Sequence, residues 1–446
     1  MTTTNREILR LALPSILANI TIPLVGIVDT AIVGHLSDAA AIGGIAIGTM
    51  LFDLLYWNFG FLRVGTSGLT AQAYGRGIPG ECKKILVQST TVALAAALVI
   101  WAIQWLFVTA VLAVVPCSPQ AADVAREYFF VRIWAAPATL MLMAMKGWFI
   151  GMQDTRSPMA VDILVNVVNM VASYGLAVWA NLGVVGVAWG TLIAQYCGLL
   201  LACTIMLKMY DLRFQIYDLR FQIYDLRFEI LDFKYIALNG NLFVRSLCFM
   251  VVYVGFTSLA GRYGDTELAV SSILMKLFMF FSFFVDGFAY AGEALVGKAI
   301  GQLSAERSKW KEISSTVRTL FVWSLGVGIA FTALYALWGR ECIELMTDNT
   351  EVLNASMPYM GWLIAMPIVS ALAFMWDGVY VGATAGRAIR NAMIWAAVAF
   401  VAVYMAGEWL VARTAWTVAP LTVLMTAYFA HLAARVLYLT VKWKEI

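Results

Sequence analysis

The sequence predicts an all-α membrane protein in which twelve transmembrane helices form two parallel six-helix repeats. Composition and an internal duplication carry this prediction. Of 446 residues, 62% are hydrophobic and 13% are charged, and the charged share is about half that of a typical soluble domain. Apolar runs of about 20 residues, enough to cross a hydrocarbon layer of about 30 Å as a helix, recur along the whole chain.

Twelve apolar runs are long enough to span a bilayer. The first continues through Pro14 and Pro23 and is too long for the apolar core of a removable signal peptide, so we expect it to be a spanning helix. The runs cover roughly residues 8–33, 41–73, 85–114, 128–151, 158–180, 184–207, 237–260, 267–299, 314–338, 355–382, 390–412 and 416–440.

Basic residues are distributed unequally between the loops. If the N-terminus is cytoplasmic, one set of alternate loops and the C-terminal tail hold twelve Lys and Arg residues, whereas the other set holds four. The positive-inside rule then places both termini on the cytoplasmic side of a plasma or inner membrane. The six cysteines have no C-x-x-C spacing and the two histidines are far apart, so we expect no metal site.

The second half of the chain repeats the first. The segment GTSGLTAQAYG (65–75) returns as AGEALVGKAIG (291–301), 226 positions later. The segment KGWFIGMQDTR (146–156) returns as DGVYVGATAGR (377–387), 231 positions later, and the match aligns Gly147 with Gly378 and Gly151 with Gly382. Because each half has an even number of helices, both halves enter the membrane in the same direction, as in transporters built from parallel repeats. A duplicated scaffold without transport is the alternative.

The duplication divides the chain into an N-terminal six-helix lobe (1–209), a linker (210–236) and a C-terminal six-helix lobe (237–446). Within the linker, residues 210–230 repeat the unit YDLRFQI three times, with one Asp and one Arg in each copy. No single helical face collects the apolar residues of this repeat. We interpret the segment as a cytoplasmic linker whose role the sequence leaves open.

Charged residues inside the apolar runs are candidate functional groups, because a charge at mid-bilayer costs at least ~2.5 kcal/mol. We take six acids and three bases of these runs as candidates, and on this set we expect acids to predominate. The acids are Asp29, Asp53, Asp162, Asp286, Glu293 and Asp377, and the bases are Arg63, Lys146 and Lys276.

Asp29 is the best placed of the acids. It lies at the centre of its run, six residues after Pro23 and three after Gly26, where a helix can bend. Because burial disfavours the charged form of a carboxylate, we expect proton uptake by Asp29 to change the packing of this helix. The alternative is a static buried ion pair with Arg63 or Lys146.

We expect three polar residues of the fifth helix to share a face toward Asp29, because amides can hold either a protonated acid or a cation. They are Asn166, Asn169 and Ser173. Met and aromatic side chains beside intramembrane charges suit lipophilic cations. The substrate-cavity candidates are accordingly Asp53, Arg63, Met143 and Lys146, and the second-lobe candidates are Asp377, Asp286 and Lys276.

Four segments carry a resemblance to a known family: LPSILANITIPLVGIVDTAIVGHL (13–36), FLRVGTSGLTAQAYG (61–75), DGFAYAGEALVGKAIG (286–301) and DGVYVGATAGRAIRN (377–391). The chain resembles the multidrug and toxic compound extrusion (MATE) transporters, and most closely their DinF-like branch. The resemblance covers nearly the whole chain apart from residues 210–230. It implies two lobes that form a V, and export of organic cations driven by inward flow of protons or sodium.

The resemblance also implies site residues. The family's first-helix acid falls on Asp29, its fifth-helix asparagines fall on Asn166 and Asn169, and its tenth-helix acid falls on Asp377. Two departures favour a proton over sodium as the coupling ion. Ser173 stands where many relatives carry a second acid, and the seventh helix (243–260) lacks the glutamate of the sodium-coupled branch.

We therefore predict a secondary antiporter, not an enzyme, that exports lipophilic organic cations in exchange for protons through Asp29. Two alternatives stay open: a flippase for a lipid-linked saccharide, which needs a cavity rich in Arg and Lys, and sodium-coupled export through Asp377. An enzyme is disfavoured because no nucleophile, base and orienting group stand at a recognisable spacing. We expect no cofactor, no nucleic-acid partner, and a monomer in the lipid bilayer.

Overall fold

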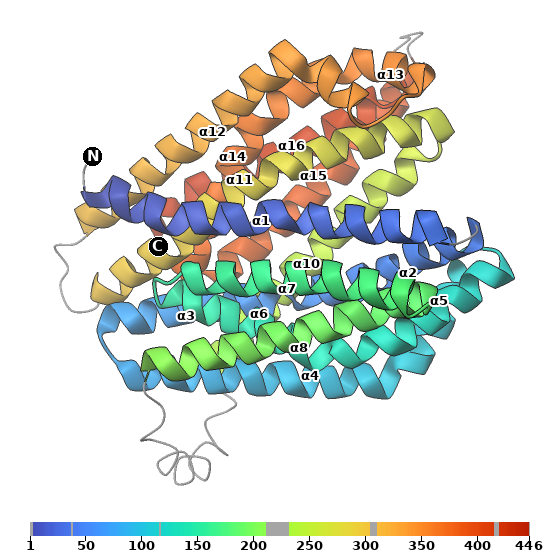
Figure 1. Ribbon diagram of the computed structural model, residues 1–446. Coiled ribbons are helices and arrows are strands. Elements are labelled where there is room, and N and C mark those ends of the chain that lie inside the picture. The colour runs from blue at the N-terminus through green and yellow to red at the C-terminus, as the bar shows by residue number, and fades with distance from the viewer. Residues whose placement is uncertain are drawn as a thin grey trace. The chain divides into compact units, whose positions relative to one another are not determined.

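The computed structural model describes residues 3–36, 39–115, 117–210, 232–303, 310–413 and 419–445 (Figure 1). Within these ranges every regular element is a helix. Twelve helical segments are long and apolar enough to cross a membrane, which confirms the predicted fold class and the predicted number of spans. The linker repeat that the sequence singles out lies outside the described residues, apart from its first tyrosine.

The contacts divide the chain into two compact units. The N-terminal unit comprises Leu17–Ile236, and the C-terminal unit comprises Met1–Ile16 together with Ala237–Ile446. Helix α1 (Thr3–Leu36) therefore contributes residues to both units. The sequence assigns the start of this helix to the first lobe, but its packing is with the second: Trp323 Nε1 donates a hydrogen bond of 3.0 Å to Asn5 Oδ1.

Among the described residues, the N-terminal unit contains the second part of α1 and seven further α-helices. Helix α4 packs against α3 and α6, and α7 packs along α8, an arrangement that Figure 1 shows around the label α6. The helices are α2 (Ala39–Trp57), α3 (Phe61–Arg76), α4 (Pro79–Val114), α5 (Pro119–Arg132), α6 (Ala136–Gly151), α7 (Arg156–Tyr174) and α8 (Gly183–Tyr210).

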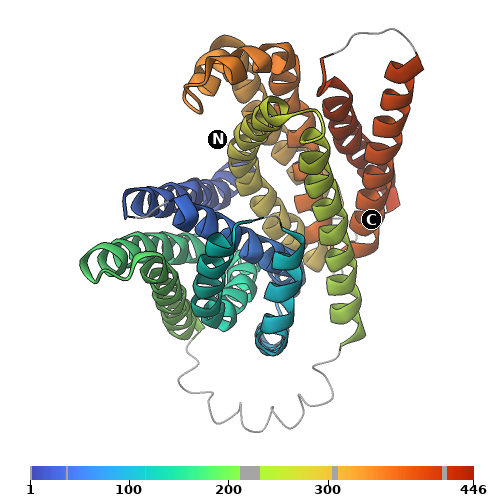
Figure 2. The same cartoon turned by 90° about the vertical axis from the view of Figure 1, so that its right-hand side faces the viewer.

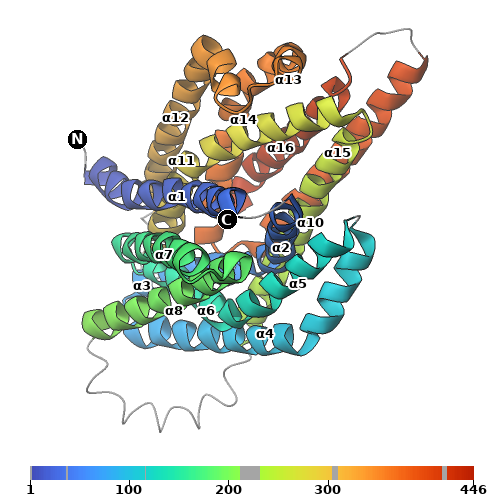
Figure 3. The same cartoon turned by 45° about the vertical axis from the view of Figure 1, so that its right-hand side comes forward.

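The C-terminal unit is built in the same way. Helix α14 packs against α11 and α12, while α15 and α16 pack against each other, as the two red helices of Figure 2 and the labels of Figure 3 show. The helices are α10 (Phe233–Ala260), α11 (Asp265–Leu303), α12 (Trp310–Glu344), α13 (Thr350–Ser356), α14 (Met360–Gly382), α15 (Gly386–Arg413) and α16 (Thr422–Lys442).

Several helices begin before the apolar run that predicts them. The predicted run 128–151 corresponds to a span that starts at Pro119, where the Ser118 side chain accepts a hydrogen bond of 3.2 Å from the backbone N–H of Ala121. Asn349 caps α13 in the same manner. Capping residues are polar, so hydropathy alone places these helix starts too late in the chain.

The duplication is visible in how two pairs of helices cross. A Cβ atom added to Gly147 of α6 would overlap the carbonyl oxygen of Arg63 on α3. A Cβ atom added to Gly378 of α14 would overlap the carbonyl oxygen of Ala289 on α11. The two glycines are 231 positions apart and their two partners are 226 positions apart. The residues that touch at the second crossing are therefore the ones that the alignment of the two halves pairs with the residues touching at the first.

One turn further along, the same relation holds again. A Cβ atom on Gly151 would lie 2.7 Å from the carbonyl oxygen of Ser67, and one on Gly382 would lie 2.7 Å from that of Glu293. Glycines four residues apart allow two membrane helices to approach backbone to backbone, because no side chain separates them. The α3–α6 and α11–α14 crossings are thus equivalent parts of the two repeats.

The turns that follow α6 and α14 are equivalent as well. Gln153 and Thr384, again 231 positions apart, adopt left-handed backbone conformations with φ of 64° and 52°. Each donates its backbone N–H to the carbonyl three residues earlier, Ile150 or Val381. A left-handed residue is a common way to end a helix, and here it ends the matching helix of each repeat.

Alanine at the crossing glycines should destabilise the fold. We expect Gly147→Ala and Gly378→Ala each to lower the free energy of unfolding by ~1–3 kcal/mol, because a methyl group would force two backbones apart. The measurement is the midpoint of thermal unfolding of the protein in detergent. Gly326→Ala in α12 is the matched control, because nothing lies within 4 Å of its added Cβ, and it should not lower the midpoint. Equal midpoints for all three variants would contradict the crossing geometry.

Candidate functional site

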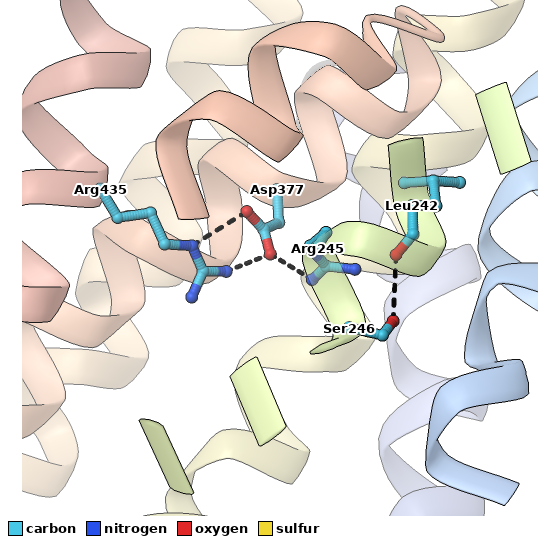
Figure 4. A network of polar contacts seen from close by, with 5 residues as sticks. All are labelled: Leu242, Arg245, Ser246, Asp377 and Arg435. Atoms are coloured by element: carbon cyan, nitrogen blue, oxygen red, sulfur yellow. Dashed lines mark hydrogen bonds and ion pairs between the residues drawn. The ribbon is translucent and has the colours of Figure 1, made fainter. Parts of the chain in front are cut away.

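A buried ionic cluster lies inside the C-terminal unit, and Figure 4 shows its members. Asp377 of α14 lies between Arg435 of α16 and Arg245 of α10. Arg435 Nε donates to Asp377 Oδ1 at 3.1 Å, and Arg435 Nη2 donates to Oδ2. Arg245 Nη2 also donates to Oδ2, at 2.5 Å. Both oxygens of the carboxylate are therefore engaged by guanidinium groups.

The fold holds this cluster rigidly. Asp377 directly precedes Gly378, whose contact with the α11 backbone fixes the position of α14. The Arg435 side chain is only 1% exposed and its guanidinium lies 5.5 Å from the centre of the Phe374 ring. Arginine remains charged in proteins, so a guanidinium at this depth needs a carboxylate partner. Asp377 supplies it.

The two arginines correct the charge balance inferred from the sequence. The predicted excess of acids over bases is wrong, because Arg245, Arg435 and also Arg132 lie within the spanning segments. Each interrupts an apolar run only once, as in FVRSLCF (243–249) and HLAARVL (431–437). A single arginine in such a run is the signal that could have revealed them.

The N-terminal unit has an ion pair of opposite polarity at the equivalent position. Lys146, which the repeat aligns with Asp377, pairs with Asp162 of α7, and these side chains are 26% and 23% exposed. The first repeat thus has a basic residue with an acidic partner at this position, whereas the second repeat has an acidic residue with basic partners. Lys146 is held by Asp162, which weakens the alternative of a static pair between Lys146 and Asp29.

The polar residues of α7, which the sequence expects to face Asp29, make contacts with two neighbouring helices, α1 and α8. Asn166 Nδ2 donates to Thr21 Oγ1 of α1 at 2.5 Å. Asn169 Nδ2 instead donates to Thr191 Oγ1 of α8 at 2.9 Å, and Ser173 lies against the same helix. Asn169 and Ser173 are one turn apart on α7. Gly190 of α8 has no side chain and so leaves room for Ser173. The Asn169 side-chain oxygen is buried without a hydrogen bond to any described residue.

Asp29 lies in the second part of α1, within the N-terminal unit, but its side chain is outside the described part of the structure. The contact between Asn166 and Thr21 places α7 against α1 two turns before Asp29. Asp53 of α2 interacts electrostatically with Arg132 of α5. The sequence does not identify Arg132 as a partner of Asp53.

The remaining candidates have different surroundings. Arg63 and Asp286 are partly buried, whereas Lys276 is exposed and forms no ion pair with a described residue. Met143 is partly buried and packs against the buried side chains of the N-terminal unit. The described residues contain no group of three or more His, Cys, Asp or Glu side chains able to hold a metal ion.

Twelve apolar spans, a duplication and buried charges inside both repeats define a multi-pass membrane transporter. The chain belongs to the MatE family, whose model matches residues 14–175 and 242–407. The two matches follow the two repeats, and residues 211–231 lie between them.

Three similar proteins illustrate the relationship. DNA damage-inducible protein F of Escherichia coli is 32% identical over 434 residues, which cover 97% of this chain and 92% of that protein. Human multidrug and toxin extrusion protein 1 is 23% identical, with 84% of this chain and 64% of that protein covered. A MOP superfamily transporter from Pyrococcus furiosus, described as having a binding pocket of reverse polarity that suggests a different function, has the same fold. Its TM-score is 0.85 at 17% identity, with 99% and 96% covered.

Proposed function

We propose that this transporter exports small organic cations in exchange for protons, and that Asp29 is the group that takes up the proton. Membership of the MatE family supports export, and the name of the human relative, multidrug and toxin extrusion protein 1, supports a toxic small-molecule substrate. The protein works as a monomer in the plasma or inner membrane with both termini in the cytoplasm, and it uses no cofactor.

The observation that carries the choice of coupling group is the engagement of Asp377. A sodium ion bound through Asp377 would need a free oxygen of that carboxylate as a ligand. Both oxygens of Asp377 accept charge-assisted hydrogen bonds from Arg245 and Arg435, and such bonds are the strong ones. Asp162 is likewise held by Lys146. These pairings favour Asp29 over Asp377 and Asp162 as the coupling group, and they disfavour sodium binding through Asp377.

The surroundings of α1 suit a proton switch. Thr21 already links α1 to Asn166 of α7, and the Asn169 side-chain oxygen has an acceptor position that no described residue uses. An amide oxygen in such a position can accept a hydrogen bond from a protonated acid. Protonation of Asp29 then changes the bend of α1 near Pro23 and Gly26, which closes the cation site in the N-terminal unit and releases the substrate outward.

A flippase for a lipid-linked saccharide is a second candidate. The candidate residues chosen from the sequence disfavour it because acids outnumber bases among them, but Arg245 and Arg435 remove that objection. A diphosphate group would require basic side chains of this kind. The two candidates differ in the charge of the transported group.

The distinguishing experiment is dye efflux from energised cells that carry the protein. We expect efflux of a cationic dye that continues without sodium and stops when a protonophore collapses the proton gradient. In a one-for-one exchange of a proton for a monovalent cation no net charge crosses the membrane, so the pH gradient supplies the driving force. Efflux that requires sodium and survives the protonophore would contradict proton coupling. Absence of dye export, with flipping of a lipid-linked saccharide instead, would favour the second candidate.

A further inference from the structure

The C-terminal unit contains more guanidinium groups than carboxylates around α10. Besides Arg245 and Arg435, Arg390 of α15 reaches α10, where its Nη1 donates to Asn241 Oδ1 at 2.8 Å. Its Nε and Nη2 donate to Asn391 Oδ1 at 3.0 and 2.8 Å. Among the described residues, Arg390 therefore bonds to amides and to no carboxylate. We call Arg245, Arg390 and Arg435 the arginine cluster.

The three members of the arginine cluster are neighbours. Asn241, which holds Arg390, and Arg245 are four residues apart on α10 and so lie on one face of that helix, one turn from each other. Arg245 and Arg435 approach the same carboxylate from opposite sides, as Figure 4 shows. Three guanidinium groups and one carboxylate leave the cluster with two positive charges more than Asp377 can balance.

The cluster also has hydrogen-bond donors that no described residue uses. Arg245 Nε is buried and has no hydrogen-bond partner there. His431 lies one turn before Arg435 on α16 and is fully buried beside Tyr428, with ring centres 5.8 Å apart. Its ring nitrogens form no hydrogen bond of good geometry with a described residue, although the backbone of Ala396 comes near them. A buried donor without an acceptor is costly, so an anionic acceptor at this place would stabilise the unit.

The cluster lies toward one end of its helices. Asp377 is five residues before the end of α14, and Arg390 is four residues after the start of α15. At 1.5 Å per residue these distances are roughly 6–8 Å, so a ligand at the membrane surface can reach the cluster. Access is through Arg245, whose side chain is 22% exposed, whereas Arg435 is 1% exposed.

We propose that the arginine cluster is a binding site for a phosphate group, either on a lipid headgroup or as free phosphate. The planar fork of a guanidinium matches the oxygens of a phosphate and can bond two of them at once. The unbalanced positive charge of the cluster suits an anionic phosphate, whether it is a free phosphate or the singly charged phosphodiester of a lipid headgroup. Arg245 Nε and Arg390 supply donors to it, while Arg435 holds Asp377 in place. The site does not depend on proton coupling, because binding requires no gradient across a membrane.

The test measures binding to the purified full-length protein in a neutral detergent. Its first probe is radiolabelled inorganic phosphate, with excess chloride to remove general ionic effects. Its second is phosphatidylglycerol added to phosphatidylcholine nanodiscs that hold the protein, with the thermal unfolding midpoint as the readout. We expect the wild-type protein to respond to at least one probe, and Arg390→Gln and Arg245→Gln each to weaken that response at least tenfold.

Arg413→Gln is the matched control, because Arg413 lies at the other end of α15 and stacks on Trp409 at 4.4 Å. It should respond as the wild type does. Arg390→Gln leaves only amides behind, so it should fold even if Arg245→Gln does not. A response to free phosphate identifies a soluble anion as sufficient, and a response to phosphatidylglycerol alone identifies a lipid headgroup. No response to either probe, or the same response in Arg390→Gln as in the wild type, would overturn the proposal.

Discussion

Replacing Asp29 with Asn is expected to reduce proton-driven efflux of a cationic dye to the level of cells without the transporter. Asparagine has nearly the same shape as aspartate but cannot take up or release a proton, so the helix would stay in the state it adopts with a neutral side chain. The measurement is the initial rate of dye efflux after energisation, normalised to the amount of protein in the membrane.

The control for this substitution is Asp123→Asn. Asp123 is an exposed acid near the start of α5 that pairs with Arg126, three residues later, and exposed pairs of this kind contribute little to stability. It should leave the efflux rate unchanged. Efflux that persists in Asp29→Asn at wild-type protein level would show that another group carries the proton.

Replacing Arg435 with Met should destabilise the C-terminal unit strongly. The substitution removes the buried partner that donates to both oxygens of Asp377 and leaves the carboxylate with Arg245 alone. Breaking a buried ion pair from one side costs ~3–5 kcal/mol. We expect a lower yield of folded protein and a fall of many degrees in the unfolding midpoint, measured by size-exclusion chromatography after heating in detergent.

Two comparisons separate the loss of the pair from a loss of volume. Arg413→Met changes an exposed arginine and should leave the midpoint within a few degrees of the wild type. The double substitution Asp377→Leu with Arg435→Met removes both charges, so its cost should be smaller than the sum of the two single costs. Additive costs would mean that Asp377 and Arg435 do not stabilise each other.

Much of the fold can be predicted from the sequence because two signals are long and redundant. Each spanning helix needs about 20 apolar residues, and twelve such runs determine the number of spans. The duplication is equally robust, because crossings through Gly147 and Gly378 require small residues at fixed intervals. The helix starts are less predictable, since one polar cap such as Ser118 changes hydropathy very little.

The site is less predictable than the fold because its partners come from distant helices. The sequence shows that Asp377 is buried but not that α10 and α16 meet it, so Arg245 and Arg435 are missed. Similarly, Asn169 turns to α8 because a glycine there admits α7 closely, which no pattern within α7 reveals. A charge can be located from one segment of sequence, but its partner depends on which segments pack together.

The most direct test of proton coupling through Asp29 uses the purified protein in liposomes without sodium. A pH gradient is imposed across the liposome membrane, and movement of a radiolabelled organic cation against the proton flow is measured. We expect the wild-type protein to accumulate the cation on the acidic side, with the gradient as the only source of energy, and Asp29→Asn to show no accumulation. Accumulation by Asp29→Asn equal to that of the wild type, or accumulation that appears only with a sodium gradient, would contradict this account.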